Sequence, residues 1–172
     1  MKYRLSEIQV EHFKIKNMEN IKIKKVTLSD IETLQKIARH TFFETFSESN
    51  TEENMKKYLE EGFSAEKLEE EITNEHSEFY FAMDDQQAIG YLKLNTGAAQ
   101  TEVLDSKSLE IERIYVIQDY HGKKVGQILY EKALEIALKK KSIYVWLGVW
   151  EENPSSSSSM RCATPRPTGR RR

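Results

Sequence analysis

Residues 109–137 read LEIERIYVIQDYHGKKVGQILYEKALEIA, and this stretch decides the fold. As far as residue 117 the residues alternate with a period of two, which predicts a β-strand. Strict alternation predicts two opposite faces, with Glu110, Glu112, Ile114 and Val116 on one and Leu109, Ile111, Arg113 and Tyr115 on the other. From residue 123 onward the apolar residues recur at helical spacing. The stretch therefore predicts a strand, a short connection and an amphipathic helix.

The start of this helix, HGKKVGQ at residues 121–127, is suited to bind an anion. The first turn of a helix leaves backbone N–H groups without intrahelical partners, and it carries the positive end of the helix dipole. Gly122 and Gly126 allow a phosphate to approach the backbone, and Lys123 and Lys124 add positive charge. The spacing fits neither a phosphate-binding P-loop nor a dinucleotide fingerprint. An ordinary connection between a loop and a helix is therefore the alternative.

The elements on either side extend this pattern. SIYVWLGVW at residues 142–150 is apolar on both faces, which predicts a strand covered on both sides of a sheet. Strand, helix and strand at this spacing predict a parallel pair joined by a right-handed crossover. Upstream we expect a strand over 20–26, helices over 29–45, 51–61 and 64–73, and a hairpin over 78–95. A capping box of Ser29 and Glu32 would open the first helix.

Composition divides the chain into three parts. Residues 1–19 show no sustained period and are interpreted as an N-terminal extension, and residues 20–153 form one domain. Residues 154–172 hold five consecutive serines, all three prolines and five arginines, which predicts a disordered tail. The abrupt loss of periodicity there is typical of translation in a shifted reading frame, and a divergent tail is the alternative.

Several classes of protein are excluded by the residues present. No apolar run approaches the ~20 residues of a membrane span, and the start has no signal-peptide pattern, so we expect a cytoplasmic protein. The single cysteine, Cys162, cannot form an internal disulfide, and the four histidines have no zinc spacing, so no metal site is expected. The arginines of the tail lack interleaved aromatic residues, which argues against a nucleic-acid partner.

The segment from 41 to 80 is strongly acidic. It holds 3 Lys or Arg against 12 Asp or Glu, a net charge of −9. Solvated helix faces would explain this charge, because glutamate is a good helix former. The alternative is a surface that attracts a cationic ligand.

The stretch from residue 109, followed by IYVWLGVWEEN at 143–153, resembles the acetyl-coenzyme A signature of the GNAT superfamily of N-acetyltransferases. More narrowly, ARHTFFETFSESNTEENMKKYLEEGFS, LEIERIYV and WLGVWEEN are similar to PaiA-type bacterial spermidine/spermine N-acetyltransferases. The resemblance covers residues 21–153. It implies an α+β fold with a mixed central sheet flanked by helices, and acetyl transfer from acetyl-CoA to a primary amine such as spermidine or spermine. The implied partner is a small cationic amine, with no membrane partner and with a homodimer among the oligomeric states.

The resemblance also implies which residues contact the cofactor. Its pyrophosphate would bind at His121, Gly122, Lys123, Lys124, Val125, Gly126 and Gln127. The pantetheine arm would pair with the backbone of Ile114, Tyr115 and Val116, and Asn153 would contact the cofactor past the last strand. This chain departs from the family pattern at His121, where glutamine or arginine is usual, and at Lys124, where glycine is usual.

The chemistry of amine acetylation points to a carboxylate base. An alkylamine has a pKa near ~10, as for lysine, and it attacks a thioester only when neutral. Glu110 is the first candidate for the base, because some family members carry theirs six residues before the equivalent of Val116. Glu112 is the second. For each, a solvent-facing or salt-bridged strand residue is the alternative.

The resemblance breaks after Asn153. Family members continue with a helix whose tyrosine is the usual general acid, and then with a final strand pair, and neither is recognisable here. We therefore expect the C-terminal helix and strand pair to be missing. Tyr144, Trp146 or Val149 would then be exposed along an unpaired strand edge. A non-catalytic regulatory module that binds acetyl-CoA or a polyamine is the alternative function.

Overall fold

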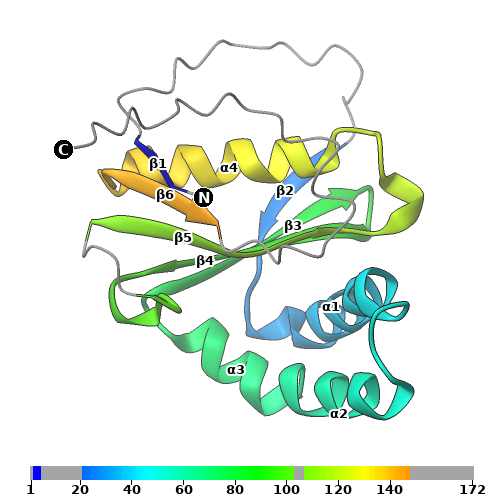
Figure 1. Ribbon diagram of the computed structural model, residues 1–172. Helices are drawn as coiled ribbons and strands as arrows, with labels where there is room; N and C mark the ends of the chain where they lie inside the picture. The colour runs from blue at the N-terminus through cyan, green and yellow to red at the C-terminus, as the bar shows by residue number, and fades with distance from the viewer. Residues whose placement is uncertain (1, 5–20, 103–106, 148–172) are drawn as a thin grey trace, which may run out of the picture.

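The computed structural model describes residues 2–4, 21–102 and 107–147, and they form one mixed sheet between two helical layers (Figure 1). The strands are β1 (Lys2–Arg4), β2 (Ile21–Lys25), β3 (Ser77–Asp84), β4 (Gln87–Thr96), β5 (Ser108–Val116) and β6 (Tyr144–Leu147). The α-helices are α1 (Ile31–Phe46), α2 (Glu52–Gly62), α3 (Ala65–Thr73) and α4 (Val125–Lys139). Short 3-10 turns lie at Leu28–Asp30, Gly97–Ala99 and Gln118–Tyr120.

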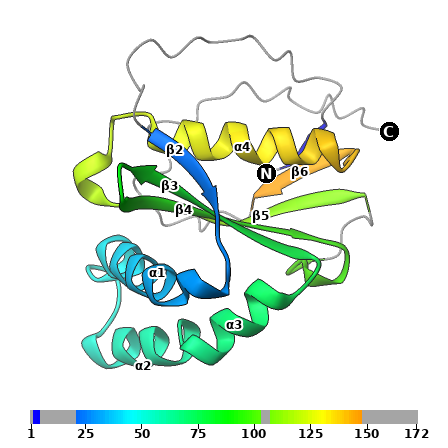
Figure 2. The ribbon, with the colours of Figure 1, turned by 180° about the vertical axis from the view of Figure 1, so that it is seen from behind.

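The strands follow the order β1-β6-β5-β4-β3-β2 across the sheet. β5 and β6 are parallel, as the sequence predicts, and all other neighbours are antiparallel. Figures 1 and 2 show α4 on one face of the sheet and α1, α2 and α3 on the other. The α+β class with a mixed central sheet is therefore confirmed.

Each face of the sheet has its own apolar core. Under α4 the buried cluster includes Leu92, Leu94, Leu109, Ile111, Val125, Leu129 and Ile136. Under α1 and α3 it includes Leu34, Ile37, Phe63, Leu68, Phe79, Phe81 and Tyr91. Apolar residues on both faces of β3 and β4 follow from this double cover, because neither face of these strands meets water.

The first helix begins differently from the prediction. The capping box of Ser29 and Glu32 is wrong, because the backbone N–H of Thr27 donates to the Asp30 carboxylate at 3.0 Å. The turn that follows Thr27 is a 3-10 turn, and α1 begins only at Ile31. Thr27 and Asp30 therefore form the cap, two positions earlier than the predicted Ser29 and Glu32.

The next two helices agree with the sequence. The Thr51 hydroxyl accepts from the Asn54 N–H at 3.3 Å, and the Ser64 hydroxyl accepts from the Lys67 N–H at 3.2 Å. These bonds satisfy N–H groups that a helix start leaves unpaired. The helices over 51–61 and 64–73 and the hairpin over 78–95 are thus confirmed to within a few residues.

The predicted N-terminal extension contains a strand of the sheet. β1 pairs antiparallel with β6, with Tyr3 opposite Val145, so the outer edge of β6 is covered. Trp146 is buried, and its ring N–H donates to Gln100 Oε1 at 2.9 Å. The edge of β6 is therefore not unpaired as predicted, because the start of the chain returns to cover it. Of the residues expected to be exposed, Trp146 is buried, Tyr144 is half-buried and Val149 lies outside the described residues.

The predictions for the end of the chain lie outside the described residues. They concern Asn153, Val149, the tail at 154–172 and the missing helix and strand pair. Within the parts of the chain that the structure describes, no helix is long and apolar enough to cross a membrane.

Candidate active site

A β-bulge in β5 shapes the site. Lys93 of β4 pairs with Arg113, but the next residue, Leu94, pairs with Ile111, so Glu112 is an extra residue on β5. Arg113 and Tyr115 therefore lie on the same face as Glu110 and Glu112, whereas Ile114 and Val116 pack with Leu109 and Ile111 under α4. The predicted strict alternation is wrong beyond Ile111, because a bulge shifts every later side chain to the opposite face.

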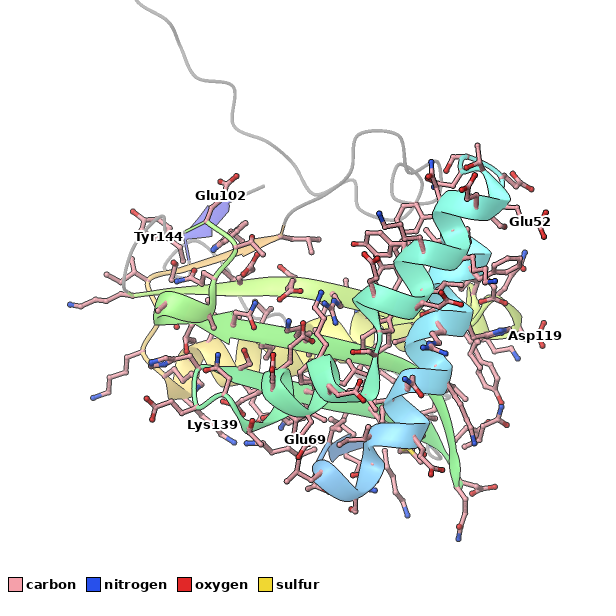
Figure 3. All side chains as sticks on the ribbon, turned by 90° about the horizontal axis from the view of Figure 1, so that it is seen from below. Glu52, Glu69, Glu102, Asp119, Lys139 and Tyr144 are labelled. Carbon is pink, nitrogen blue, oxygen red and sulfur yellow. The ribbon has the colours of Figure 1, made fainter. Side chains whose placement is uncertain are left out.

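A cleft of about 420 Å³ opens on the face of the sheet that carries Glu110. Four aromatic side chains line it: Phe42 of α1, Tyr58 of α2, Phe63 directly after α2, and Tyr115 of β5. Phe42 and Tyr58 are stacked, with ring centroids 4.5 Å apart and planes at 2°. Figure 3 views the molecule from this side and shows α1, α2 and α3 lying across the strands. The cleft thus has aromatic walls and a polar floor on β5.

Glu110 lies in the floor, with 2% of its surface exposed. Asn95 Nδ2 donates to Glu110 Oε2 at 3.1 Å, and the Thr101 backbone N–H donates to the same oxygen at 2.9 Å. The Thr101 hydroxyl donates to the other oxygen, Oε1. All three donors are uncharged. Among the described residues, therefore, no cationic side chain forms an ion pair with Glu110.

Glu112 has a different environment. Lys93 Nζ lies 2.7 Å from its Oε2, Arg113 Nη2 lies 3.1 Å from its Oε1, and Asn95 Nδ2 also donates to it. Burial raises the pKa of Glu112, but Arg113 and Lys93 outweigh that effect and hold the pKa below its usual range. The salt-bridged alternative therefore describes Glu112. A carboxylate stabilised in this way is a weaker proton acceptor than one with neutral partners.

The loop and helix start after β5 bring together the predicted anion-binding residues. His121 Nε2 hydrogen-bonds the Val116 carbonyl at 2.8 Å, and Lys124 has the left-handed φ of 61°. The N–H groups of Gln127 and Ile128 donate to the Lys124 carbonyl at 3.0 and 3.2 Å. The N–H groups of Val125 and Gly126 come before these two, at the positions that a helix start leaves without intrahelical partners.

The two glycines of this segment have space around them. A Cβ added to Gly122 meets nothing within 4 Å, and one added to Gly126 meets only Val116 Cγ2, at 3.9 Å. Packing within the chain therefore does not demand glycine at position 126. The space suits a ligand group that approaches the backbone, so the residues present fit a phosphate-bearing cofactor.

Other predicted cofactor residues have different surroundings. Val125 is the first residue of α4 and its side chain is buried against the sheet, so only its backbone can face a ligand. Among the described residues β5 pairs with β6 only from Ser108 to Ile111. Beyond that point Ile114, Tyr115 and Val116 pair with β4 on one edge. A strand with one edge unpaired can pair with the amide groups of an extended ligand.

Sequence patterns did not reveal the residues that hold the carboxylates. Asn95 was expected only as part of a hairpin strand, and Thr101 only as part of a loop. Lys93 as a whole residue is only 4% exposed. Lysine is rarely buried without a partner, and here Glu71 and Glu112 are its partners. The sequence did hold one signal for these residues. Lys93 and Asn95 are polar and two residues apart in a predicted strand, so they share a face of the sheet.

In the described parts of the chain, no group of three or more His, Cys, Asp or Glu residues could hold a metal ion.

Comparisons with known proteins identify the family of the chain. The model of the acetyltransferase (GNAT) family matches residues 32–160. An uncharacterized N-acetyltransferase of Lactobacillus delbrueckii subsp. lactis is 38% identical over 141 residues, which are 82% of each chain. The spermidine N(1)-acetyltransferase of Thermoplasma acidophilum is 31% identical over 138 residues, 78% of this chain and 81% of that protein.

A solved structure is similar over nearly the same length. The PaiA N-acetyltransferase of Thermoplasma acidophilum, crystallised with coenzyme A, superposes with a TM-score of 0.70 at 30% identity. The match covers 80% of this chain and 84% of that one. The family model and these two PaiA-type matches show that the chain belongs to the GNAT family of acetyltransferases and is PaiA-like.

Proposed function

We propose that this acetyltransferase transfers the acetyl group of acetyl-CoA to a primary amine, and that the amine is a polyamine such as spermidine or spermine. The observation that carries the proposal is Glu110, a buried carboxylate with uncharged partners at the floor of an aromatic cleft. Such a group can take the proton that a cationic amine must lose before it attacks a thioester.

Binding of acetyl-CoA is assigned to the segment between β5 and α4. The backbone N–H groups at the start of α4, with Gly122, Gly126 and Lys123, would hold the pyrophosphate. The backbone of Ile114, Tyr115 and Val116 would pair with the pantetheine arm, whose thioester would then lie beside the floor of the cleft. Coenzyme A is bound in the Thermoplasma PaiA structure, which supports acetyl-CoA as the co-substrate.

Glu110 is proposed as the general base. It would accept the proton of the ammonium group, directly or through one water, and the neutral nitrogen would attack the thioester carbonyl carbon. The carbon–sulfur bond breaks as the amide forms, the attacking nitrogen loses its second proton, and the leaving sulfur takes up that proton through water, so coenzyme A leaves as the thiol. Glu112 is the second choice, because Lys93 and Arg113 lower its pKa.

The aromatic walls support an alkylamine acceptor. Ammonium groups are attracted to aromatic ring faces, and methylene groups pack against them. The net charge of −9 in residues 41–80, which include α2 and α3, would attract a cation toward the cleft. The Thermoplasma relative named as a spermidine N(1)-acetyltransferase is consistent with such an acceptor.

Release of free thiol from acetyl-CoA tests this proposal directly. Spermidine and spermine should support thiol release better than acidic or apolar amines, and added salt should reduce the preference. Binding of coenzyme A without thiol release from any amine would instead favour a non-catalytic binding module. A preference for an acidic acceptor that does not depend on salt would refute the polyamine substrate and leave acetyl transfer intact.

A further inference from the structure

Four charged side chains at the floor of the cleft form a closed ring of ion pairs, and two of them, Glu112 and Arg113, line the cleft itself. Lys93 Nζ lies 2.9 Å from Glu71 Oε1 and 2.7 Å from Glu112 Oε2. Arg113 Nη1 lies 3.0 Å from Glu71 Oε2, and Arg113 Nη2 lies 3.1 Å from Glu112 Oε1. Each carboxylate therefore contacts both cations, and each cation contacts both carboxylates.

Three different elements supply this ring. Glu71 comes from α3, Lys93 from β4, and Glu112 and Arg113 from the bulge of β5. The side chains are 6% exposed for Lys93, 14% for Arg113, 15% for Glu71 and 17% for Glu112. Charges buried to this degree are weakly screened by water and salt, so each one acts on its neighbours over several ångströms.

The ring balances its own charge. Lys93 and Arg113 supply two positive charges, and Glu71 and Glu112 supply two negative charges. Glu110, beside the ring, bonds only to the uncharged Asn95 and Thr101 in the described residues. When it is ionised, Glu110 therefore leaves one unbalanced negative charge in the floor.

One further cation lines the cleft. Lys67 of α3 is exposed at its edge, so water screens its charge more than the charges of the ring. Without Glu71, by contrast, the two buried cations would face only Glu112 and Glu110. The buried floor would then carry no net charge.

We propose that Glu71 is a specificity-determining residue, which balances Lys93 and Arg113 so that the floor of the cleft keeps the negative charge that selects a cationic acceptor. The inference rests on the proposed acetyl transfer to an amine. It adds that a residue of α3, outside the strand that carries the candidate base, decides which amines are accepted.

The test compares a cationic acceptor with a neutral one. Thiol release is measured with spermidine and with an arylamine that is uncharged at neutral pH. In Glu71→Gln, the kcat/KM for spermidine relative to the arylamine should fall about tenfold, since one weakly screened charge is removed. Glu69→Gln is the matched control. Glu69 is exposed on the same helix, where Figure 3 labels it, and its loss should leave the ratio unchanged.

A second pair of variants separates charge from structure. Lys93→Gln makes the floor more negative, so the preference for spermidine should rise above that of the wild type. Glu71→Gln combined with Lys93→Gln removes one charge of each sign and should return the ratio toward the wild-type value. A merely structural role predicts that both single variants lose activity alike and that the double variant recovers nothing, and either result would overturn the proposal.

Acceptor binding without turnover keeps this inference separate from the proposed function. If no amine releases thiol in the wild type, acetyl transfer to amines fails, and the charge of the floor is judged by calorimetric binding of spermidine and of the arylamine. Glu71→Gln should weaken spermidine binding relative to arylamine binding by about tenfold, and the double variant should restore the ratio. An unchanged ratio of the two affinities in Glu71→Gln would overturn the inference.

Discussion

Glu112 and Arg113 are consecutive residues, yet their side chains form an ion pair of 3.1 Å on one face of β5. Successive residues of a regular strand point to opposite faces, so this contact requires the bulge that leaves Glu112 unpaired with β4. The bulge brings Arg113 under α3, where it meets Glu71, and it keeps Glu110 apart with uncharged partners. One extra residue in the strand therefore explains why Glu112 forms ion pairs and Glu110 has uncharged partners.

Replacement of Glu110 tests the proposed base. Glu110→Gln keeps the shape and the Thr101 N–H contact but removes the proton acceptor, so kcat should fall by about 10²–10⁴-fold. Coenzyme A binding, measured by calorimetry, should be unchanged. Glu102→Gln, an exposed change at the adjacent loop that Figure 3 labels, is the control and should keep full activity. Full turnover in Glu110→Gln would assign the base elsewhere.

A branched side chain at Gly126 should block the cofactor and spare the fold. A Cβ there meets only Val116 Cγ2 at 3.9 Å, and valine has a higher helix propensity than glycine. Gly126→Val should therefore keep the thermal midpoint, while calorimetry should show coenzyme A binding weakened by at least about tenfold, since a side chain would occupy the place of the phosphate oxygens. Leu138→Val, an exposed change at the other end of α4, should bind as the wild type does. Equal affinity for coenzyme A in both variants would mean that the pyrophosphate does not bind at this helix start.

Acid should destabilise the fold through Glu78. Burial raises the pKa of this carboxyl, but Lys140, Tyr80 and Lys25 outweigh it and lower the pKa from 4.5 to about 2. Because the folded pKa is the lower one, the stabilisation is complete above about pH 4.5 and is lost as the pH falls toward 2. Thermal midpoints recorded from pH 7 to pH 2 should fall more steeply in the wild type than in Glu78→Gln. Glu70→Gln, at an exposed position of α3, should follow the wild type. Parallel curves for the wild type and Glu78→Gln would contradict the assignment.

Removal of residues 1–4 should expose the edge of β6. β1 pairs with β6 from Lys2 to Arg4, and an unpaired edge strand promotes association between chains. The shortened chain should melt a few degrees lower, since ~1 kcal/mol shifts the midpoint by roughly 2–4 °C at this size, and it should scatter more light at high concentration. A Lys2→Ala variant keeps the backbone pairing and serves as the control. If the shortened chain matches the wild type in both measurements, β1 does not protect the sheet.

Short sequence patterns predicted most helices and strands, because the residues that start and stop these elements lie within a few positions of each other. Thr51 and Ser64 cap α2 and α3 through bonds to N–H groups three residues away, and such signals can be read from a short window. The first capping box was misplaced because Thr27 and Ser29 are both good caps, and in the structure Asp30 accepts from the Thr27 N–H. The site was predicted in part: Glu110 and the helix start at Gly122 came from the sequence, and Asn95, Thr101 and Glu71 did not.

The sequence by itself determined the strands and helices from β2 to β6, the parallel crossover from β5 to β6 and the segment proposed to hold a phosphate. These features depend on periodicity, glycine and capping residues, which act over a few positions. Only the tertiary structure decided that Glu112 is a bulge residue, that β1 covers β6, and that Glu71 meets Arg113 across 42 positions of sequence. Strand register and buried ion pairs depend on which distant segments pack together, and no local window holds that information.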